Sequence, residues 1–499
     1  MPTRPRPSRK HPAPDLLQRA AEALTTFLPR QRWFGGKGRV IQGISLCDHA
    51  PLPGTEAELA LFEARYRDGG SETYFIPVAG GPDGGWVDAA DPRLALAVGE
   101  AIRAGLTLPG QRGAFRCLPT ESFAEILPEP GREALPVPAE HSNTSLILDH
   151  HGMLKLYRRL EPGPNPDVEI LDALTRFTGF REAPRVAGTI VYDGLDAERT
   201  TVAALQDYVA GQGDAWDAAM VRLAEYYAAA EEQPAFARTL AAADASDAQR
   251  LGALTGRLHM ALASPALPAA LRAESMGPGE VAEWLSGMRQ QADHAFGLLR
   301  TALPTVGPDV RPLAERSLDN VPTILAALEA LRALETEPAA KLRIHGDYHL
   351  GQILRAGDRL VILDFEGEPS RPLVERRKKQ SALKDVAGML RSFAYAAEAA
   401  LLAIADRQAG DRDVRQRLGS WADAWEEGVR AGFLRGYLAE TWERGAPFLP
   451  RTRATLEAAV KVFEIDKAVY ELHYEITHRP NWIRIPLTGL VRAAGATPP

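Results

Sequence analysis

Apolar residues in the first part of the chain follow two different periods. Between residues 15 and 27 they recur every three or four positions, as Leu16, Leu17, Ala20, Ala21 and Leu24 do, which predicts a helix that ends at Pro29. After it come short apolar runs separated by glycine-rich turns, and we interpret these runs as strands at 40–46, 59–66, 72–77 and 85–87. Residues 15–90 should therefore form a small β-rich N-terminal unit.

The rest of the chain changes from mixed to helical spacing. The next expected elements are a helix and two strands, at 92–104, 144–148 and 153–157. A proline-rich stretch at 127–138 is typical of a linker. Beyond Ser246 the apolar spacing is helical almost to the end, apart from a hairpin-like segment at 341–368. The predicted division is a disordered basic tail, the β-rich unit, a mixed region and a helical lobe, at 1–14, 15–90, 91–210 and 211–499.

Bulk composition excludes several classes of protein. The net charge of −7 argues against a nucleic-acid partner. Two cysteines, Cys47 and Cys117, cannot build a disulfide framework and suit a reducing cytoplasm. The longest apolar stretch, 394–405, contains Glu398 and is too short to span a bilayer. We therefore expect a cytoplasmic protein without a membrane span.

The densest group of chemically active residues lies between 345 and 366. His-Gly-Asp-Tyr-His-Leu-Gly-Gln (345–352) is followed, after a short apolar run, by Asp-Phe-Glu (364–366). Asp347, Gln352 and Asp364 have the order in which protein kinases place a catalytic aspartate, a metal-binding amide and a metal-binding aspartate. We predict that Asp347 orients the acceptor hydroxyl and takes up its proton. Gln352 and Asp364 would bind Mg²⁺ against the phosphates of ATP.

Two other interpretations exist for the same block. His345, Asp347 and His349 alternate, so on a strand they would share one face and could bind a metal directly, as in a metallohydrolase. No second cluster of His and Asp accompanies them in the sequence. A purely structural loop is the other alternative. The pairing of this block with Asp364 favours phosphoryl transfer over both.

A kinase also needs a cation for the nucleotide phosphates. Lys155 lies in the apolar strand predicted at 153–157, and Glu169 lies where the next helix opens. A strand lysine followed by a helix glutamate predicts the ion pair of a kinase N-lobe. Lys155 and Glu169 are therefore our candidates for phosphate binding.

The loop before this strand lacks the usual glycines. In their place stand Ser142, Asn143, Thr144 and Ser145, whose backbone N–H groups and small side chains could bind phosphate. Gln206 lies in a segment, 205–209, that has the character of an inter-lobe hinge. Such a hinge would offer backbone groups to adenine.

Together with these residues, motifs spread over nearly the whole chain resemble those of the bacterial maltokinases, relatives of the aminoglycoside phosphotransferases. The further motifs are LPRQRWF at 28–34, DFEGEP at 364–369, DVAGMLRSF at 385–393, KAVYEL at 467–472 and RPNW at 479–482. The resemblance implies an α+β, eukaryotic-protein-kinase-like bilobal fold with a mixed N-lobe, a large helical C-lobe and a β-rich N-terminal cap domain. It also implies ATP-dependent phosphorylation of maltose at its anomeric hydroxyl, giving maltose 1-phosphate between trehalose and α-glucan, with a trehalose synthase as a possible partner.

Sugar recognition calls for carboxylates, amides, arginines and aromatic faces. Lys467, Tyr470, Glu471 and Tyr474 are three or four positions apart, so on a helix they would share one face. They could form a wall of the acceptor site, or an aromatic stripe in the core. Asp385 and Arg391 could be pocket residues or a buried ion pair. His345, Glu366, Asp385 and Arg391 complete the residues that we expect at the substrate.

Two rival functions remain beside a maltokinase. One is a kinase of another sugar or amino sugar, such as glucosamine. The other is a pseudokinase that acts as a scaffold, which predicts the loss of at least one catalytic residue. Lys155, Asp347, Gln352 and Asp364 are all present, which opposes the scaffold hypothesis.

Overall fold

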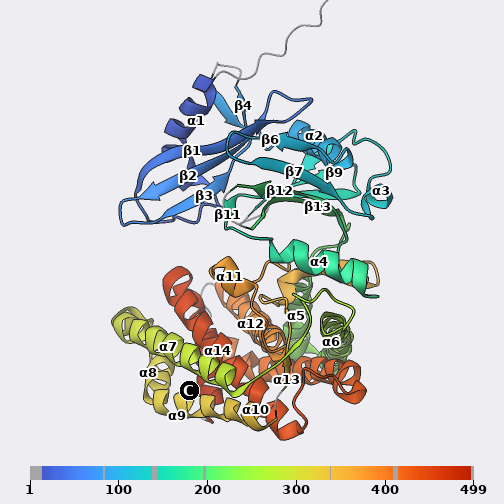
Figure 1. Cartoon of the computed structure of the whole chain (residues 1–499). Coiled ribbons are helices and arrows are strands. Elements are labelled where there is room, and N and C mark those ends of the chain that lie inside the picture. The colour runs from blue at the N-terminus through green and yellow to red at the C-terminus, as the bar shows by residue number, and fades with distance from the viewer. Residues whose placement is uncertain are drawn as a thin grey trace, which may run out of the picture. The chain divides into compact units, whose positions relative to one another are not determined.

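Two units make up the chain (Figure 1). The structure is a computed structural model that describes residues 14–81, 85–137, 143–194, 198–337, 339–407 and 414–495. The first unit comprises Met1–Thr175, Pro184–Ala210 and Glu368–Arg376, and the second comprises Arg176–Ala183, Gly211–Gly367 and Arg377–Pro499. The predicted tail at 1–14 lies outside the described residues except for its last position.

The N-terminal sheet of the first unit confirms the predicted β-rich pattern. Its path is β11–β3–β2–β4–β5, and β1 pairs with β2. Helix α1 (Pro14–Phe27) buries Leu17, Ala20 and Leu24 in one cluster with Phe62 and Tyr74 of the sheet. The strands are β1 (Ile41–Pro51), β2 (Glu58–Tyr66), β3 (Ser71–Phe75), β4 (Val78–Gly80), β5 (Trp86–Asp88) and β11 (Arg159–Leu160).

A second sheet of seven strands has the order β6–β7–β12–β13–β10–β9–β8. Its strands are β6 (Thr107–Pro109), β7 (Ala114–Pro119), β8 (Ala134–Pro136), β9 (Asn143–Leu148), β10 (Gly152–Tyr157), β12 (Val186–Asp193) and β13 (Thr200–Asp207). The expected linker at 127–138 is wrong, because β8 lies within it and pairs with β9. Prolines are tolerated there because β8 is an edge strand.

The segment after β10 connects the second sheet to the N-terminal sheet. After β10 the chain passes through Arg158 and enters the N-terminal sheet as β11. The side chain of Arg158 is buried and donates to Asp88 Oδ2 at 2.9 Å and to Thr144 Oγ1 at 2.8 Å. The strand that carries Lys155 is thus anchored to both sheets. The helices of this unit are α2 (Pro92–Arg103), α3 (Phe123–Ile126), α4 (Pro166–Phe177, which ends in the second unit) and α11 (Leu373–Arg376).

The second unit is mainly helical, and its helices start at Ala215, earlier than the expected position beyond Ser246. They are α5 (Ala215–Glu232), α6 (Pro234–Leu262), α7 (Pro278–Ala302), α8 (Arg311–Asp319), α9 (Val321–Leu328), α10 (Ala333–Thr336), α12 (Leu383–Arg407), α13 (Val414–Glu440), α14 (Arg453–His478) and α15 (Arg484–Ala493). The expected hairpin is confirmed as β16 (Ile353–Ala356) and β17 (Arg359–Ile362), and β14 (Glu274–Ser275) pairs with β15 (Ala340–Lys341). Helix α12 has the length and apolarity of a membrane span, but 83% of its apolar window is buried inside the protein.

Close packing of α6 against α13 depends on glycines. Gly252 and Gly256 lie four positions apart on α6, and Gly432 and Gly436 lie four apart on α13. A side chain at Gly436 would collide with the carbonyl of Gln249 on α6. Glycine costs about 1 kcal/mol in a helix relative to alanine. These glycines therefore weaken each helix slightly, but they allow the two helix backbones to approach closely.

We predict that Gly436→Ala destabilises the protein by roughly 1–3 kcal/mol, because the added methyl group overlaps the α6 backbone. The matched control is Gly428→Ala on the same helix, where an added Cβ would meet nothing within 4 Å. That substitution should instead raise stability by about 1 kcal/mol. Thermal unfolding of both variants is the measurement, and equal melting temperatures would contradict the close-packing explanation.

Candidate functional site

In the first unit, Lys155 of β10 forms an ion pair in the interior. Its Nζ lies 3.2 Å from Oδ2 of Asp167, and both side chains are buried. Gln206 of β13 donates from Nε2 to the same oxygen at 2.7 Å. Asp167 lies in the first turn of α4, and its backbone N–H donates to Asn165 Oδ1 at 2.8 Å. The carboxylate of Asp167 therefore accepts from both the lysine and the amide, and it lies in the first turn of a helix, where negative charge is favoured.

This geometry adds one residue to the predicted lysine site. Asp167, two positions before the predicted Glu169, pairs with Lys155. The part of Glu169 in phosphate binding stays a prediction. Gln206 is a buried strand residue bound to Asp167, so its side chain belongs to the lysine site, and the binding of adenine by backbone groups of 205–209 stays a prediction.

The predicted phosphate loop is described only in part. Ser142 lies outside the described residues. Asn143, Thr144 and Ser145 form the start of β9, with Asn143 and Ser145 buried. Thr144 Oγ1 accepts from Arg158 Nε at 2.8 Å. These three side chains therefore belong to the sheet, and their part in phosphate binding stays a prediction.

In the second unit, Asp347 lies on the loop between β15 and β16 with its carboxylate partly exposed. Lys467 Nζ of α14 lies 3.6 Å from Oδ1, and His349 Nε2 lies 3.8 Å from Oδ2. Burial lowers the pKa of His349 below its usual value, despite the opposing effect of Asp347. Its Nδ1 accepts from the N–H of Gly351 at 3.1 Å, so the neutral ring carries its proton on the nitrogen that faces Asp347.

Gln352 and Asp364 meet as the sequence predicts. Gln352 Nε2 lies 3.3 Å from Asp364 Oδ2, and the carbonyl of Gln352 accepts from the N–H of Leu363 at 2.9 Å. Asp364 has a φ of 64°, a left-handed conformation that is rare for a residue other than glycine. Such strain is typical of functional positions, because the surrounding structure must impose it.

The same pair fits Mg²⁺ chemically. Mg²⁺ prefers oxygen ligands and commonly uses one or two carboxylates together with waters and phosphate oxygens. The amide of Gln352 can present its oxygen instead of its nitrogen by a half turn of the side chain, since the two atoms occupy equivalent positions. Within the described ranges no group of three or more His, Cys, Asp or Glu converges as a metal site.

His345 and Asp385 support this loop from the inside. Asp385 of α12 accepts the N–H of His345 at 2.8 Å and the N–H of Gly346 at 2.9 Å. His345 Nε2 donates to the carbonyl of Leu363 at 2.8 Å. Both side chains are at most 2% exposed. This corrects the expectation that they contact substrate, because a sugar hydroxyl cannot reach a carboxylate that is buried and already accepts several hydrogen bonds.

Arg391 and Glu471 also pair in the interior. Arg391 of α12 donates from Nε and Nη2 to Glu471 Oε2 of α14, at 3.0 and 2.7 Å. Burial opposes the charge on Arg391, but the attraction of Glu471 is stronger and raises the pKa of the guanidinium. Arg391 thus forms a buried ion pair, but with Glu471 and not with Asp385, which binds His259 and the loop backbone. Only one oxygen of Glu471 is bound in this pair, so a contact with a sugar stays a prediction.

The remaining predicted acceptor residues lie nearer to solvent. Lys467 lies over the ring of Tyr470, with Nζ 4.8 Å from the ring centroid. Tyr474 is exposed and stacks on His478 with ring centroids 4.5 Å apart. Glu366 is half-buried two positions after Asp364. Because Lys467 is next to Asp347, Lys467 and Tyr470 are the strongest candidates of the α14 set for the acceptor site.

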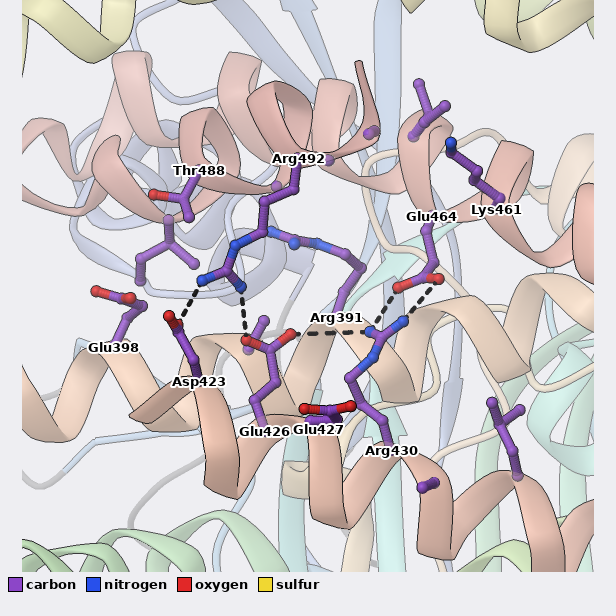
Figure 2. A pocket seen from close by; sticks show the side chains of 18 residues that line it. Arg391, Glu398, Asp423, Glu426, Glu427, Arg430, Lys461, Glu464, Thr488 and Arg492 are labelled. Carbon is purple, nitrogen blue, oxygen red and sulfur yellow. Dashed lines mark hydrogen bonds and ion pairs between the residues drawn. The ribbon is translucent and has the colours of Figure 1, made fainter. Parts of the chain in front are cut away.

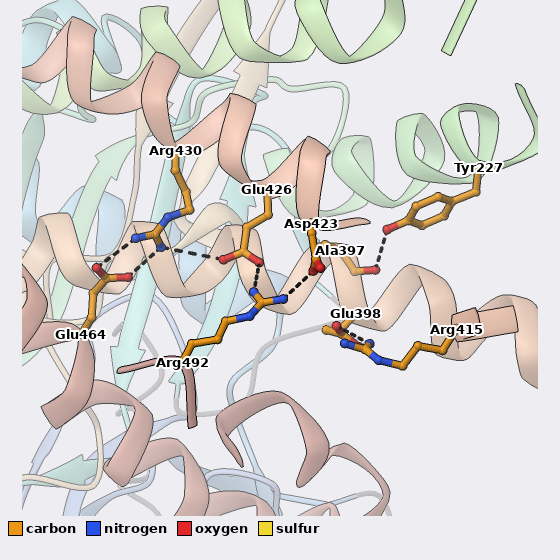
Figure 3. Close-up of polar contacts among 9 residues, drawn as sticks. All are labelled: Tyr227, Ala397, Glu398, Arg415, Asp423, Glu426, Arg430, Glu464 and Arg492. Atoms are coloured by element: carbon orange, nitrogen blue, oxygen red, sulfur yellow. Dashed lines mark hydrogen bonds and ion pairs between the residues drawn. The ribbon is translucent and has the colours of Figure 1, made fainter. Parts of the chain in front are cut away.

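A polar pocket of about 670 Å³ lies elsewhere in the second unit, among α12, α13, α14 and α15 (Figure 2). Its arginines are already paired: Arg492 with Glu426 at 3.1 Å and with Asp423, and Arg430 with Glu464 at 2.6 Å (Figure 3). Asp347, Gln352 and Asp364 do not line it. We interpret this pocket as a hydrated crevice between ion-paired helices and not as the catalytic site.

Sequence reasoning missed Asp167, His259 and Tyr437. His259 Nε2 of α6 lies 3.1 Å from Asp385 Oδ2, and its Nδ1 lies 3.1 Å from the hydroxyl of Tyr437 on α13. The sequence signal that could have indicated His259 was a histidine on the apolar face of a predicted helix. The partner could not be found from the sequence, because Asp385 is 126 positions away from His259 and Tyr437 is 178 positions away.

The chain is similar in sequence and in fold to several known proteins. Residues 27–94 match the maltokinase N-terminal cap domain. A glucosamine kinase of Streptacidiphilus jiangxiensis is 29% identical over 73% of this chain and 74% of its own. A glucosamine kinase of Mycolicibacterium smegmatis (strain ATCC 700084 / mc(2)155) is 27% identical over 70% and 77%. The fold matches a glucosamine kinase solved with glucosamine, ADP and inorganic phosphate, with a TM-score of 0.67, 23% identity and coverage of 97% and 99%. Residues 27–94 are therefore similar to the maltokinase N-terminal cap domain, and the chain as a whole is similar in sequence and fold to glucosamine kinases.

Proposed function

We propose that this protein is an ATP-dependent sugar kinase that phosphorylates maltose at its anomeric hydroxyl to give maltose 1-phosphate. The observation that carries the proposal is Asp347, a partly exposed carboxylate on a loop whose backbone is bound by the buried Asp385. Gln352 and Asp364 lie together beside the same loop. The cap-domain match supports maltose as the acceptor.

Glucosamine is the second candidate acceptor, because the curated relatives are glucosamine kinases. The charge beside Asp347 favours the neutral sugar. Lys467 Nζ lies 3.6 Å from the base, so an acceptor hydroxyl there comes close to a positive charge. An acceptor that carries its own ammonium group would be repelled by this charge, whereas maltose would not.

Each of the proposed functional residues has one task. Asp347 accepts a hydrogen bond from the acceptor hydroxyl, orients it toward the γ-phosphate and takes up its proton as the O–P bond forms. Lys155, fixed by Asp167, binds the α- and β-phosphates of ATP. Gln352 and Asp364 would hold Mg²⁺, which neutralises phosphate charge. Lys467 keeps positive charge near the reacting oxygen, where negative charge collects.

The resemblance to maltokinases extends the proposal to metabolism. Maltose 1-phosphate would serve the building of α-glucan, and maltose would come from trehalose through a trehalose synthase, which is a possible partner. A cytoplasmic location agrees with this role. None of these proposals changes the chemistry of the site.

A panel of sugars tests the acceptor. We expect ATP consumption with maltose at a kcat/KM at least about 100-fold above that with glucosamine, because specific hydrogen bonds and charge together supply several kcal/mol of discrimination. A coupled assay of ADP release, with phosphate position assigned by NMR, is the measurement. Preference for glucosamine would overturn the maltose proposal and leave the kinase proposal standing.

Asp347→Asn tests the base. The substitution keeps the size of the side chain and removes the carboxylate, so the rate should fall by roughly 10²–10⁴ while nucleotide binding stays unchanged. Turnover at saturating substrates and binding of ADP by calorimetry are the two measurements. Turnover near that of the wild type would remove Asp347 from this role.

Asp167→Ala and Glu169→Ala, compared side by side, test which carboxylate serves Lys155. Asp167→Ala should raise the KM for ATP strongly, because it leaves the lysine and Gln206 without their shared acceptor. Glu169→Ala should have the smaller effect. The KM values for ATP and the melting temperatures of both variants decide this. The reverse order of effects would restore the assignment predicted from the sequence.

A further inference from the structure

A chain of buried polar groups runs from α13 to the catalytic loop. Tyr437 of α13 contacts Nδ1 of His259 on α6, and Nε2 of His259 contacts Oδ2 of Asp385 on α12. Asp385 in turn accepts the backbone N–H groups of His345 and Gly346. Tyr437, His259 and Asp385 are each at most 2% exposed. Asp347 is the next residue in the loop.

The chemistry of the partners fixes the direction of each hydrogen bond. Burial raises the pKa of Asp385, but the hydrogen bonds from His259 and from the loop N–H groups outweigh burial and bring its pKa below the usual value. Asp385 is thus a carboxylate that can only accept, so His259 must donate from Nε2. Burial raises the pKa of Tyr437 far above its usual value, so its phenol keeps its proton. That phenol can donate to Nδ1 and so keep the histidine proton on Nε2.

Helix α6 supports the loop at a second point on the same face. Thr255, four positions before His259, lies with its Oγ1 2.8 Å from the hydroxyl of Tyr348, the residue after Asp347. Residues four apart on a helix share a face, so one face of α6 contacts the loop directly at Tyr348 and supports it through Asp385 at residues 345 and 346. The close glycine packing of α6 on α13 brings Tyr437 to His259, because a side chain at Gly436 would separate the two helices.

The loop itself depends on this support. Gly346 has a φ of 83°, which other residues adopt only with strain, and a Cβ there would lie 3.3 Å from Gly367 Cα. Both oxygens of Asp385 are used to bind this turn. If the carboxylate rotated, the N–H groups of residues 345 and 346 would lose their acceptors together. The direction of the Asp347 side chain would change with them.

We propose that His259 and Tyr437 are positioning residues for phosphoryl transfer, which orient Asp385 and, through the loop backbone, set Asp347 against the acceptor hydroxyl. This inference rests on the proposed role of Asp347 as the base. Neither residue touches substrate, so their effect is on the rate of the chemical step and not on the binding of sugar or ATP.

Tyr437→Phe is the first test, with Tyr227→Phe as its matched control. Tyr227 is as buried as Tyr437, and its hydroxyl donates to the carbonyl of Ala397 at 3.0 Å (Figure 3). Ala397 lies on α12, the helix that carries Asp385, but far along it from Asp385. Each variant loses one buried hydroxyl and one hydrogen bond, so both should lose similar thermal stability. Tyr437→Phe should lower kcat by about tenfold with both KM values unchanged, since small displacements of a catalytic group are costly. Tyr227→Phe should leave kcat unchanged, with active sites counted by ADP binding in both.

His259→Leu and His259→Gln form the second test. Leucine removes the donor to Asp385, and kcat should fall by about 100-fold. Glutamine can still donate an N–H to Asp385, so kcat of His259→Gln should be at least about tenfold higher than kcat of His259→Leu. A purely structural role predicts instead that kcat per active site stays constant in all variants and that only the melting temperature falls. That outcome would overturn the inference.

A double-mutant cycle separates failure of this inference from failure of the proposed function. If His259 acts through Asp347, His259→Leu should have little further effect on the residual rate of Asp347→Asn. If the two substitutions lower the rate independently, so that their effects multiply in the double variant, the positioning role is refuted and Asp347 remains the base. A fully active Asp347→Asn would refute the proposed base itself. The assays use the whole chain and maltose, or glucosamine if the sugar panel identifies it.

Discussion

The buried carboxylate of Asp385 is the constraint on which the catalytic loop depends. A carboxylate in the interior is costly unless several donors satisfy it, and a satisfied one determines where those donors lie. Asp385 has three such donors, two from the loop backbone and one from His259. The loop can therefore adopt a turn with a left-handed glycine and still direct Asp347 outward.

Three aspartates of this protein have different roles because their surroundings differ. Asp385 and Asp167 are buried and act as acceptors for a loop and for Lys155, respectively. Asp347 is partly exposed, and Lys467 and His349 are near it without closing it off. A carboxylate that must exchange protons with a substrate needs that access. The two buried carboxylates instead hold a loop backbone and a lysine in place.

Ion pairs between helices determine how α14, which carries Lys467, packs against its neighbours. The buried pair of Arg391 and Glu471 connects α12 to α14 one turn away from Lys467. Buried pairs of this kind add little net stability, but breaking one leaves a charge without a partner and is strongly destabilising. The pair thus determines how α12 and α14 pack together, although it adds little to the free energy of folding. Lys467 reaches Asp347 because α14 has this one position.

The sequence by itself indicated the class of chemistry and part of the elements. The spacing of Asp347, Gln352 and Asp364 was enough to predict a kinase, since phosphoryl transfer needs those groups in that order along a loop and hairpin. Alternating and helical periods located helices α1 and α2 and strands such as β2 and β10, because these periods are local properties of the backbone, whereas β6, β7 and β12 were not predicted. The stretch at 127–138 was assigned wrongly because its prolines are compatible with an edge strand, which local composition does not reveal.

Tertiary structure alone decided which carboxylate meets Lys155, which predicted substrate residues are buried, and which residues support the loop. The sequence indicated Glu169 as the partner of Lys155, and only the packing of α4 showed that Asp167 pairs with this lysine. His345 and Asp385 looked like substrate residues until their burial was known. His259 and Tyr437 are 178 positions apart and meet only because glycines let α6 and α13 approach closely. Contacts of this kind depend on long-range packing, and no local pattern of residues encodes them.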